Sequence, residues 1–365
     1  MKLKTKSALL VSSIIVLILM SSVTMAWAKT RGSYLLEFAK ANETPTGGFT
    51  NTPTPTARVT EQATYANLYL LYKFGGTTDF DDFSTREWLR EEITLNALGL
   101  KLKETYFGYA ALNLMGEELN TTDQTTVISQ MTKLNTTNAF SMVEDGVPSA
   151  AATYYGVKLF SYLGINIDLD YDQIAVFLLT LFDNETGGFV SSPESNQATP
   201  FDTYYVIMTL AEMNRLALLT RTQELAVIDY LEGLYVDEPI FEKHYGGYSM
   251  SQDIPSSLIA LTYYCTFVLS QFEDVELPEQ TKTWLLGRQD PRTYGFAEIP
   301  GDNSQTGATA ITSFYAVSVL ELYGASFDDH VWVLEIDPVT IGIIIALVVL
   351  VLAGIGYAIY YRRTQ

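Results

Sequence analysis

The pattern of apolar positions along the chain recurs six times in one register. Each copy begins with Thr or Ser followed by aromatic residues, is apolar on most sides, and spans the same eleven steps. The copies cover residues 64–75, 105–116, 153–164, 203–214, 262–273 and 313–324. Self-similarity at such a spacing is typical of an array of supersecondary units, and a segment that is apolar on most sides predicts a helix buried by neighbours on both flanks.

Glycine marks the end of most of these predicted helices. Gly75, Gly116, Gly164 and Gly324 close four of the six copies. Each glycine falls where the C-cap of a helix favours a residue in the left-handed conformation. The six helices are therefore predicted to end at these positions and at their equivalents in the other two copies.

A second pattern, Gly-Gly followed by an aromatic residue or a variant of it, precedes most of the buried helices. It stands at residues 47–49, 139–140, 187–189, 246–248 and 294–296. Glycine permits a tight turn, and the aromatic ring is expected to fill the helix layer next to it. The aromatic residue of each turn, at 49, 140, 189, 248 and 296, is called the plug. Upstream lie amphipathic stretches such as 171–181 and 224–234, with Asp172 and Thr222 placed to start the helices.

One repeat is thus predicted as an outer helix, a Gly-Gly-aromatic turn, a loop and an inner helix. Six such units sum to about 300 residues and show no obvious polar caps, which an open solenoid needs. The predicted fold is therefore all-α: an α/α toroid over residues 29–327, with six helix-pair repeats in two concentric rings.

The N-terminal segment is typical of an export signal. Lys2, Lys4 and Lys6 precede an apolar run over residues 8–23, and Ala-Trp-Ala at 26–28 suits a signal peptidase. Residues 1–28 are therefore predicted to be a signal peptide. An uncleaved anchor is the alternative, because the apolar run, about 18 residues when counted up to Met25, is long for a signal.

The C-terminal segment is typical of a membrane span. Residues 339–361 carry no charge and are followed by Arg362 and Arg363. Arginine directly after a span indicates its cytoplasmic side. We therefore expect a single C-terminal transmembrane helix at the cell membrane, a cytoplasmic tail at 362–365, a short stalk at 328–338 and the toroid outside. Four glycosylation sequons, at Asn42, Asn120, Asn135 and Asn184, are compatible with that side.

Composition excludes two classes of function. Lys and Arg number 22 against 42 Asp and Glu, a formal net charge of −20, so a nucleic-acid backbone would be repelled. Cys265 is the only cysteine, and His244 and His330 are the only histidines, which excludes the usual Cys/His zinc modules. We expect Cys265 to be a buried thiol. His244 with Lys243 is either a solvated turn pair or a contact for an anionic ligand.

The repeat resembles that of the α/α-toroid superfamily, which includes protein prenyltransferase β subunits and terpenoid cyclases. The stretch 183–189, Asp-Asn-Glu-Thr-Gly-Gly-Phe, followed by Pro-Phe-Asp-Thr at 200–203, is most similar to Rab geranylgeranyl transferase β subunits. The resemblance covers residues 32–327 and all six units. It implies the toroid fold independently of the periodicity.

The resemblance also implies where transferase chemistry would lie. In those transferases a zinc ion is held by an Asp-x-Cys pair that heads one inner helix and a His that heads the next. Here Ser149, Ala150 and Ala151 stand at the first place and Asp202 at the second. Alanine cannot ligate a metal and serine is a poor zinc ligand, so no zinc or other cofactor is expected. The acidic loop 143–146 also offers no positive site for a diphosphate.

The residues that cyclase chemistry requires are present only in part. The acids Asp168, Asp170 and Asp172 have the wrong spacing for the cyclase Asp-x-Asp-Asp acid and precede an outer helix, where carboxylates cap free N–H groups. Gln289 and Gly295 match a cyclase signature, but Ala297 stands where Trp belongs. Asp202 is left as the weak catalytic candidate, with an N-cap role as the alternative.

Tyrosine pairs at the inner-helix starts are the candidate ligand site. The predicted cavity residues are Tyr106, Tyr154, Tyr155, Tyr204, Tyr205, Tyr263, Tyr264 and Tyr315, with Tyr65 and Phe314 in the same register. Tyrosine offers an apolar surface and a hydroxyl, which suits a lipid, isoprenoid, glycan or peptide. The alternative is that the rings interdigitate and fill a solid core.

The sequence is compatible with three functions, each from a different class of protein. The first is a membrane-anchored, extracytoplasmic binding or scaffold protein that uses the aromatic cavity or its acidic face, with no protein partner identifiable. The second is an enzyme of the prenyltransferase and terpenoid cyclase superfamily acting on an isoprenoid or other lipid, with Asp202 beside Glu144 or Asp145 as acids. The third is a structural surface-layer or adhesion component.

Overall fold

The structure of the chain, a computed structural model, describes residues 29–54, 56–76, 80–136, 139–164, 169–241, 243–290, 292–298 and 307–329. The predicted signal peptide, transmembrane helix and tail, and all but the first two residues of the predicted stalk, lie outside the described residues. Within those ranges no helix combines the length and apolarity that a membrane crossing requires. One compact unit spans Gly32–Ser326, and it is described here by itself.

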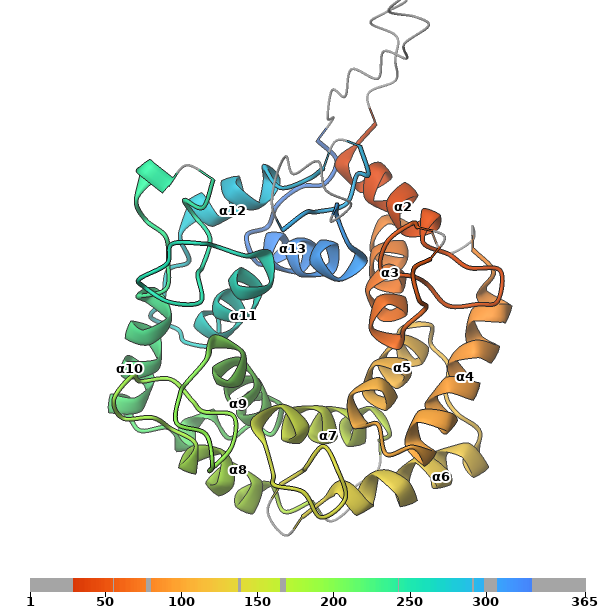
Figure 1. Ribbon diagram of the computed structural model, residues 1–365, viewed down its shortest axis with the longest axis horizontal. Coiled ribbons are helices and arrows are strands. Elements are labelled where there is room, and N and C mark those ends of the chain that lie inside the picture. Colours follow the sequence, from red (N-terminus) through yellow and green to blue (C-terminus); the bar gives the residue numbers. More distant parts are fainter. Residues whose placement is uncertain are drawn as a thin grey trace, which may run out of the picture. The chain divides into compact units, whose positions relative to one another are not determined.

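Twelve α-helices of the described residues form two concentric rings, as the sequence predicts (Figure 1). The inner ring consists of α3 (Glu61–Phe74), α5 (Leu102–Leu114), α7 (Ala150–Tyr162), α9 (Pro200–Glu212), α11 (Ile259–Leu269) and α13 (Ala310–Leu322). Each inner helix contacts the next, and α13 contacts α3 to close the ring. The predicted α/α toroid is confirmed.

The outer ring consists of α2 (Arg31–Ala41), α4 (Asp82–Leu98), α6 (Thr121–Met131), α8 (Tyr171–Thr180), α10 (Arg221–Glu232) and α12 (Glu279–Leu286). Short 3₁₀ turns η1 (Thr132–Leu134), η2 (Leu216–Leu218) and η3 (Pro239–Phe241) follow or precede these helices. Extended pairing in the described part of the chain is limited to isolated bridges in the loops.

The helix starts differ from the prediction by one turn or less. Inner helix α9 begins at Pro200, three residues before Thr203, because the Thr199 hydroxyl accepts the backbone N–H of Asp202. Outer helix α8 is capped by Asp170 and not by Asp172. Helix α10 is capped by Thr220 in a capping box and not by Thr222. The predicted tyrosine pairs consequently lie in the second turn of the inner helices.

The predicted C-terminal glycines have the expected left-handed backbone. Gly75, Gly116, Gly164 and Gly324 have φ values of 85°, 71°, 63° and 58°. Asn214 takes the same place after α9 with φ of 56°. Asparagine tolerates this conformation better than most residues, which explains why it can replace glycine there.

Each predicted plug residue is buried and held by one recurring hydrogen bond. The backbone N–H of the plug donates to the hydroxyl that opens the inner-helix copy of the same repeat. The pairs are Phe49 with Thr64 (2.9 Å), Phe140 with Thr153 (3.2 Å), Phe189 with Thr203 (3.0 Å), Tyr248 with Thr262 (3.1 Å) and Phe296 with Ser313 (2.8 Å). All ten side chains are at most 1% exposed.

The repeat of α5 has no plug, and the hydroxyl at the equivalent position, that of Thr105, therefore has no plug N–H to accept. Thr105, in α5, has no aromatic turn before it and donates only to the carbonyl oxygen of Lys101 in its own helix, at 2.8 Å. The other hydroxyls join the turn to the inner helix. The Thr or Ser at this register position therefore has a structural reason that the sequence pattern did not reveal.

The first glycine of the turn permits close packing on the next outer helix. A Cβ added to Gly187, whose φ is 84°, would lie 2.5 Å from the backbone oxygen of Ala226 in α10. A Cβ on Gly47 would lie 2.3 Å from the backbone oxygen of Ser84 in α4. Real Cβ atoms do not approach backbone oxygen this closely, so only glycine fits at both turns.

In three repeats the loop that follows the plug caps the inner helix of the preceding repeat. The residue two positions after Phe189 is Ser191, whose carbonyl oxygen accepts the backbone N–H of Ala150 at 2.9 Å. The residue two positions after Phe296 is Glu298, whose carboxylate accepts the backbone N–H of Ile259 at 2.5 Å. These bonds satisfy N–H groups that a helix leaves free at its start.

The same bond closes the ring between the last and first repeats. Asn51, two positions after Phe49, accepts the N–H of Ala310 on its carbonyl oxygen at 2.8 Å and that of Ile311 on its side chain at 3.1 Å. At the opposite end of α13, Glu321 bonds Lys73 and Tyr69 of α3. Both ends of α13 are thus tied to the first repeat.

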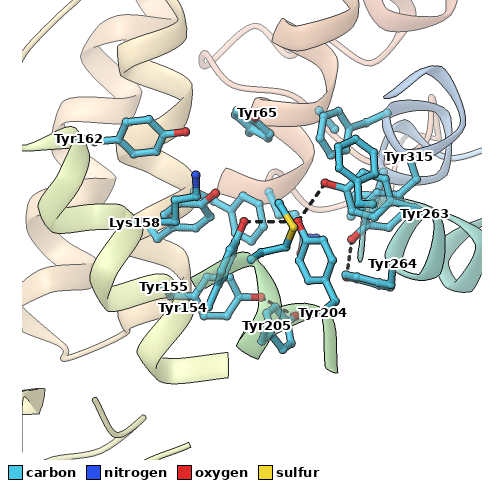
Figure 2. Close-up of a pocket in the computed structure, with 18 residues that line it drawn as sticks. Tyr65, Tyr154, Tyr155, Lys158, Tyr162, Tyr204, Tyr205, Tyr263, Tyr264 and Tyr315 are labelled. Atoms are coloured by element: carbon cyan, nitrogen blue, oxygen red, sulfur yellow. Dashed lines mark hydrogen bonds between the residues drawn. The ribbon is translucent and has the colours of Figure 1, made fainter. Parts of the chain in front are cut away.

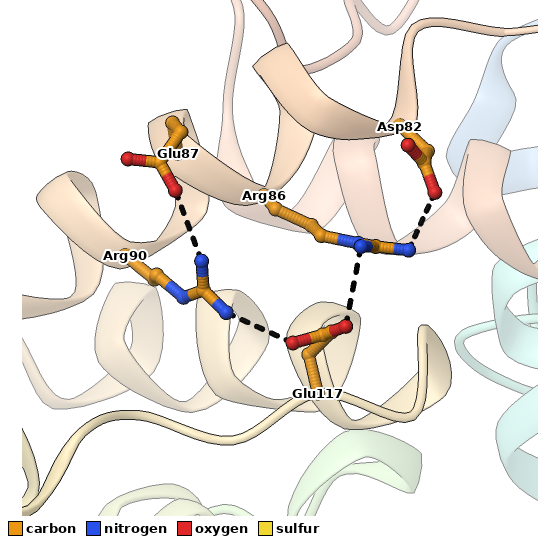
Figure 3. Close-up of polar contacts among 5 residues, drawn as sticks. All are labelled: Asp82, Arg86, Glu87, Arg90 and Glu117. Carbon is orange, nitrogen blue, oxygen red and sulfur yellow. Dashed lines mark hydrogen bonds and ion pairs between the residues drawn. The ribbon is translucent and has the colours of Figure 1, made fainter.

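Outer helix α4 is tied to the following repeat by a network of ion pairs (Figure 3). Glu117 accepts from Arg86 at 3.3 Å and from Arg90 at 2.9 Å. Arg86 also pairs with Asp82 at 2.5 Å, and Arg90 with Glu87 at 2.9 Å. All five side chains are partly exposed, so each pair contributes little by itself and the network matters mainly for orientation.

We predict that removing one plug acceptor destabilises the whole ring. Thr203→Val leaves the buried N–H of Phe189 without its acceptor, which costs about 1–3 kcal/mol. Urea unfolding followed by circular dichroism measures the loss, and Thr203→Ser is expected to restore most of it. Thr105→Val is the matched control, because Thr105 is equally buried but holds no plug. Equal losses for the two valine variants would contradict the assignment.

Candidate functional site

Two layers of aromatic side chains face the axis of the inner ring. They occupy the two positions directly after each Thr or Ser that holds a plug, and after Thr105. The first layer is Tyr65, Tyr106, Tyr154, Tyr204, Tyr263 and Phe314; the second is Phe107, Tyr155, Tyr205, Tyr264 and Tyr315, with Ala66 completing it. All twelve residues line one cavity, and those of α5, which has no plug bond, line it as the others do.

Hydroxyl groups join neighbouring inner helices within these layers (Figure 2). The oxygen pairs are Tyr154 with Tyr204 (3.4 Å), Tyr204 with Tyr263 (3.2 Å), Tyr155 with Tyr205 (2.9 Å) and Tyr264 with Tyr315 (3.0 Å). A buried tyrosine hydroxyl needs a partner, and each of these seven finds one in an adjacent repeat.

The rings contact one another inside the ring of inner helices that Figure 1 shows. The centroids of Tyr263 and Tyr315 lie 4.5 Å apart, and those of Tyr204 and Tyr264 lie 4.7 Å apart. A cavity of about 210 Å³ remains between them. This volume lies below the roughly 300–1,000 Å³ typical of ligand pockets. The sequence allowed either an open hole or a solid core. The structure lies between the two, because the rings contact one another and still leave a cavity.

All eight predicted cavity residues line this one cavity, as do Tyr65 and Phe314. Sequence reasoning missed further lining residues on the same helices: Lys158, Met208 and Phe267 lie one turn along, and Tyr162 lies two turns along. Lys158, Met208 and Phe267 each stand five positions after the Thr of their repeat. That constant offset was the available signal, since residues four apart on a helix share a face.

Burial keeps the tyrosine hydroxyls of the cavity uncharged. It raises the pKa of Tyr154 and of Tyr315 to about 12, from an ordinary value of 10.0. It raises the pKa of Tyr204 and Tyr263 well above that ordinary value as well. At neutral pH the cavity therefore offers neutral hydrogen-bond groups and apolar ring faces, and Lys158 is the one ionised side chain in its described lining.

Asp202 belongs to the capping arrangement of α9. The Thr199 hydroxyl donates to its carboxylate at 2.5 Å and accepts its backbone N–H at 3.1 Å. Burial raises the pKa of Asp202 in spite of that bond. Neither Asp202 nor the exposed loop residues Glu144 and Asp145 is among the described residues that line the cavity. The N-cap of α9 is Thr199 and not Asp202, so the expected N-cap role of Asp202 is wrong; Asp202 lies in the first turn and accepts a hydrogen bond from the capping residue.

The remaining candidates have structural partners. Ser149, which stands where the transferases carry a zinc ligand, caps α7 by accepting the backbone N–H of Ala152 at 3.2 Å. His244 accepts the N–H of Ser257 on Nδ1 at 3.1 Å, so its contact is internal. Cys265 is buried, and burial raises the pKa of its thiol. In the part of the chain that the structure describes, no three His, Cys, Asp or Glu side chains are grouped to hold a metal.

We predict that the cavity tyrosines resist ionisation until the toroid unfolds. Because their folded pKa is raised above the unfolded value of 10.0, the folded state keeps protons that the unfolded state loses above pH 10. The unfolding free energy therefore falls as pH rises from 10 to about 12, by about 1.4 kcal/mol per pH unit for each such tyrosine.

Near-ultraviolet absorbance of tyrosinate and circular dichroism, followed in one alkaline titration, check this. The late tyrosinate signal is expected to coincide with loss of helix, and Tyr154→Phe with Tyr315→Phe is expected to shift unfolding to higher pH. Complete tyrosine ionisation in a protein that remains helical would contradict the burial of the two layers.

Comparison with solved structures identifies the same fold in two classes of enzyme. A protein geranylgeranyltransferase-I of Candida albicans in complex with GGPP matches with a TM-score of 0.51 and 17% identity, over 61% of this chain and 67% of that one. The type II terpene cyclase MstE of Scytonema, in its apo form, matches with a TM-score of 0.54 and 12% identity, over 80% and 98%. At these identities the likeness concerns the fold alone.

A variant of the same cyclase in complex with geranylgeranyl dihydroxybenzoate matches with a TM-score of 0.51 and 11% identity, over 80% of this chain and 96% of that one. No curated protein sequence matches the chain. The family of the prenyltransferase alpha-alpha toroid domain matches residues 5–146, 89–198 and 151–335, which together cover most of the chain. This protein therefore belongs to the prenyltransferase alpha-alpha toroid domain family.

Proposed function

We propose that this protein is a membrane-anchored toroid, exported so that residues 29–327 lie outside the cytoplasm, that binds a small, uncharged and largely apolar molecule on its axis. The observation that carries the proposal is the aromatic cavity of about 210 Å³, to which all six repeats contribute. A cavity of about 150 Å³ lined by apolar side chains already accepts benzene. A single ring, a short branched chain or one end of a longer chain is therefore the size that fits.

The chemistry of the lining supports an uncharged ligand. Most lining side chains are Tyr or Phe, and burial keeps the tyrosines neutral. Ring faces suit a hydrocarbon, and the hydroxyl groups can exchange a bond within the layer for one to the ligand. Isoprenoid molecules are the ligands in the solved structures of two toroids of similar fold, which favours an isoprenoid or a comparable hydrocarbon here.

The alternative of an enzyme acting on an isoprenoid or other lipid receives less support from the site. Protonating an alkene requires a strong acid within reach of the substrate. Tyrosines whose pKa is raised are too weak for that step, and Asp202 is engaged by Thr199 away from the described lining. We therefore favour binding over catalysis. An acidic scaffold with no ligand is the remaining competitor, and an empty cavity would favour it.

Filling the cavity is expected to abolish binding. Ala66 is the only member of the two layers without a ring, and it is 1% exposed. Native mass spectrometry of the detergent-purified full chain, followed by solvent extraction, is expected to find one small apolar molecule per toroid. Ala66→Phe should remove it, Ala66→Val should reduce it, and Tyr154→Phe, which keeps the volume, should retain it.

Circular dichroism of each variant serves as the folding control for this experiment. A wild-type chain that carries no bound molecule, and stays empty after incubation with membrane lipids of its host, would contradict the binding function. Retention of the molecule by a folded Ala66→Phe variant would place the ligand elsewhere.

Membrane anchoring and export can be tested with single cysteines, because Cys265 is buried and its thiol is held protonated. Gln197 is exposed on the toroid, and Thr364 lies in the predicted tail. In intact cells a membrane-impermeant maleimide should label Gln197→Cys and leave both Thr364→Cys and the wild-type chain unlabelled. Permeabilised cells should expose Thr364→Cys. The reverse pattern would contradict the proposed orientation.

A further inference from the structure

Two lysine–glutamate pairs join neighbouring inner helices, and only one of them reaches the cavity. Lys158 of α7 pairs with Glu212 of α9 at 2.5 Å, and Lys158 lines the cavity. Lys73 of α3 pairs with Glu321 of α13, and Lys73 is not among the described lining residues. The second pair accounts for closure of the ring. The first requires another explanation, because it places an ammonium group beside an otherwise neutral aromatic cavity.

The geometry of Lys158 leaves it able to donate to a ligand. An ammonium group has three N–H donors, and Glu212 occupies one of them. Ser161 donates to the other oxygen of Glu212 at 2.8 Å, which holds the carboxylate in place. Burial raises the pKa of Glu212, but the bonds from Lys158 and Ser161 outweigh it and lower the pKa below its ordinary value. Figure 2 shows the Lys158 amine among the tyrosine side chains of the cavity.

The charges of the pair decide which ligand it prefers. Lys158 and Glu212 together are neutral, so a bound anion would gain attraction from the ammonium and lose most of it to the carboxylate. A neutral acceptor gains a hydrogen bond from a charged donor, which is stronger than a bond from a neutral hydroxyl. The pair therefore suits an uncharged oxygen, such as that of an alcohol, aldehyde or ketone, attached to a hydrocarbon.

We propose that Lys158, positioned by Glu212, is the specificity-determining residue of the cavity and selects an uncharged oxygen-bearing hydrocarbon over a plain hydrocarbon or a carboxylate. This inference rests on the proposed binding function. It adds the class of the ligand and the residue that recognises its oxygen.

Fluorine NMR with three probes of one size tests the proposal on the detergent-purified full chain. The probes are 4-fluorobenzyl alcohol, 4-fluorotoluene and 4-fluorobenzoate, with an empty-micelle sample as the blank. The wild-type protein should bind the alcohol about tenfold more tightly than the other two probes. The reason is that 4-fluorotoluene has no oxygen to accept the hydrogen bond from Lys158, and the carboxylate of 4-fluorobenzoate is repelled by Glu212 beside Lys158. Lys158→Met should remove this preference and keep the affinity for 4-fluorotoluene.

Two further variants separate the role of Lys158 from its contribution to the fold. Lys73→Met breaks the equivalent pair outside the cavity lining and should leave the preference unchanged. Glu212→Gln removes the compensating carboxylate and should raise the affinity for 4-fluorobenzoate by about tenfold relative to the alcohol. This gain of binding requires a folded site, so it reports on Lys158 even where Lys158→Met folds poorly.

The outcomes distinguish this inference from the function on which it rests. If 4-fluorotoluene binds and the alcohol is not preferred, or if Lys73→Met abolishes the preference as Lys158→Met does, the assignment of Lys158 is wrong and the cavity still binds hydrocarbons. If no probe binds to the wild-type chain at millimolar concentration, the binding function and the role of Lys158 fall together.

Discussion

The architecture depends on one hydrogen bond that recurs in five of the six repeats, from the buried N–H of an aromatic plug to the hydroxyl at the head of an inner helix. A buried N–H without an acceptor is costly, so the plug cannot settle without this hydroxyl. The bond joins the turn to the inner helix of its repeat. The two residues after the hydroxyl line the cavity in these five helices, and Tyr106 and Phe107 of α5 line it without a plug bond.

Contacts between repeats turn the array into a closed ring. In three repeats the residue two positions after the plug, which is Ser191, Glu298 or Asn51, caps the inner helix of the preceding repeat. Helix α9 needs no such bond from Met250, because it begins with Pro200, which has no N–H. Asn51 is decisive, since it caps the last inner helix from the first repeat. A solenoid with that bond has no free end, and this explains the lack of polar caps.

The cavity is the space that the two aromatic layers leave unfilled. Eleven of the twelve positions carry rings, and Ala66 is the exception. The cavity is small, and burial keeps its tyrosines neutral, so Lys158 is the one charged side chain in its described lining. The side chains that pack the inner ring are therefore the same ones that would select a ligand under the proposed binding function.

The sequence by itself determined the six repeats, the glycine C-caps, the buried plugs and the inward tyrosines, because each depends on local periodicity and backbone conformation. The tertiary structure decided the rest. Asp202 turned out to be a capping partner of Thr199, and Lys158 met Glu212 from a helix one repeat away. The volume of the cavity also follows only from the tertiary structure. These features depend on rotamers and on neighbours about fifty residues distant, which periodicity along the chain does not encode.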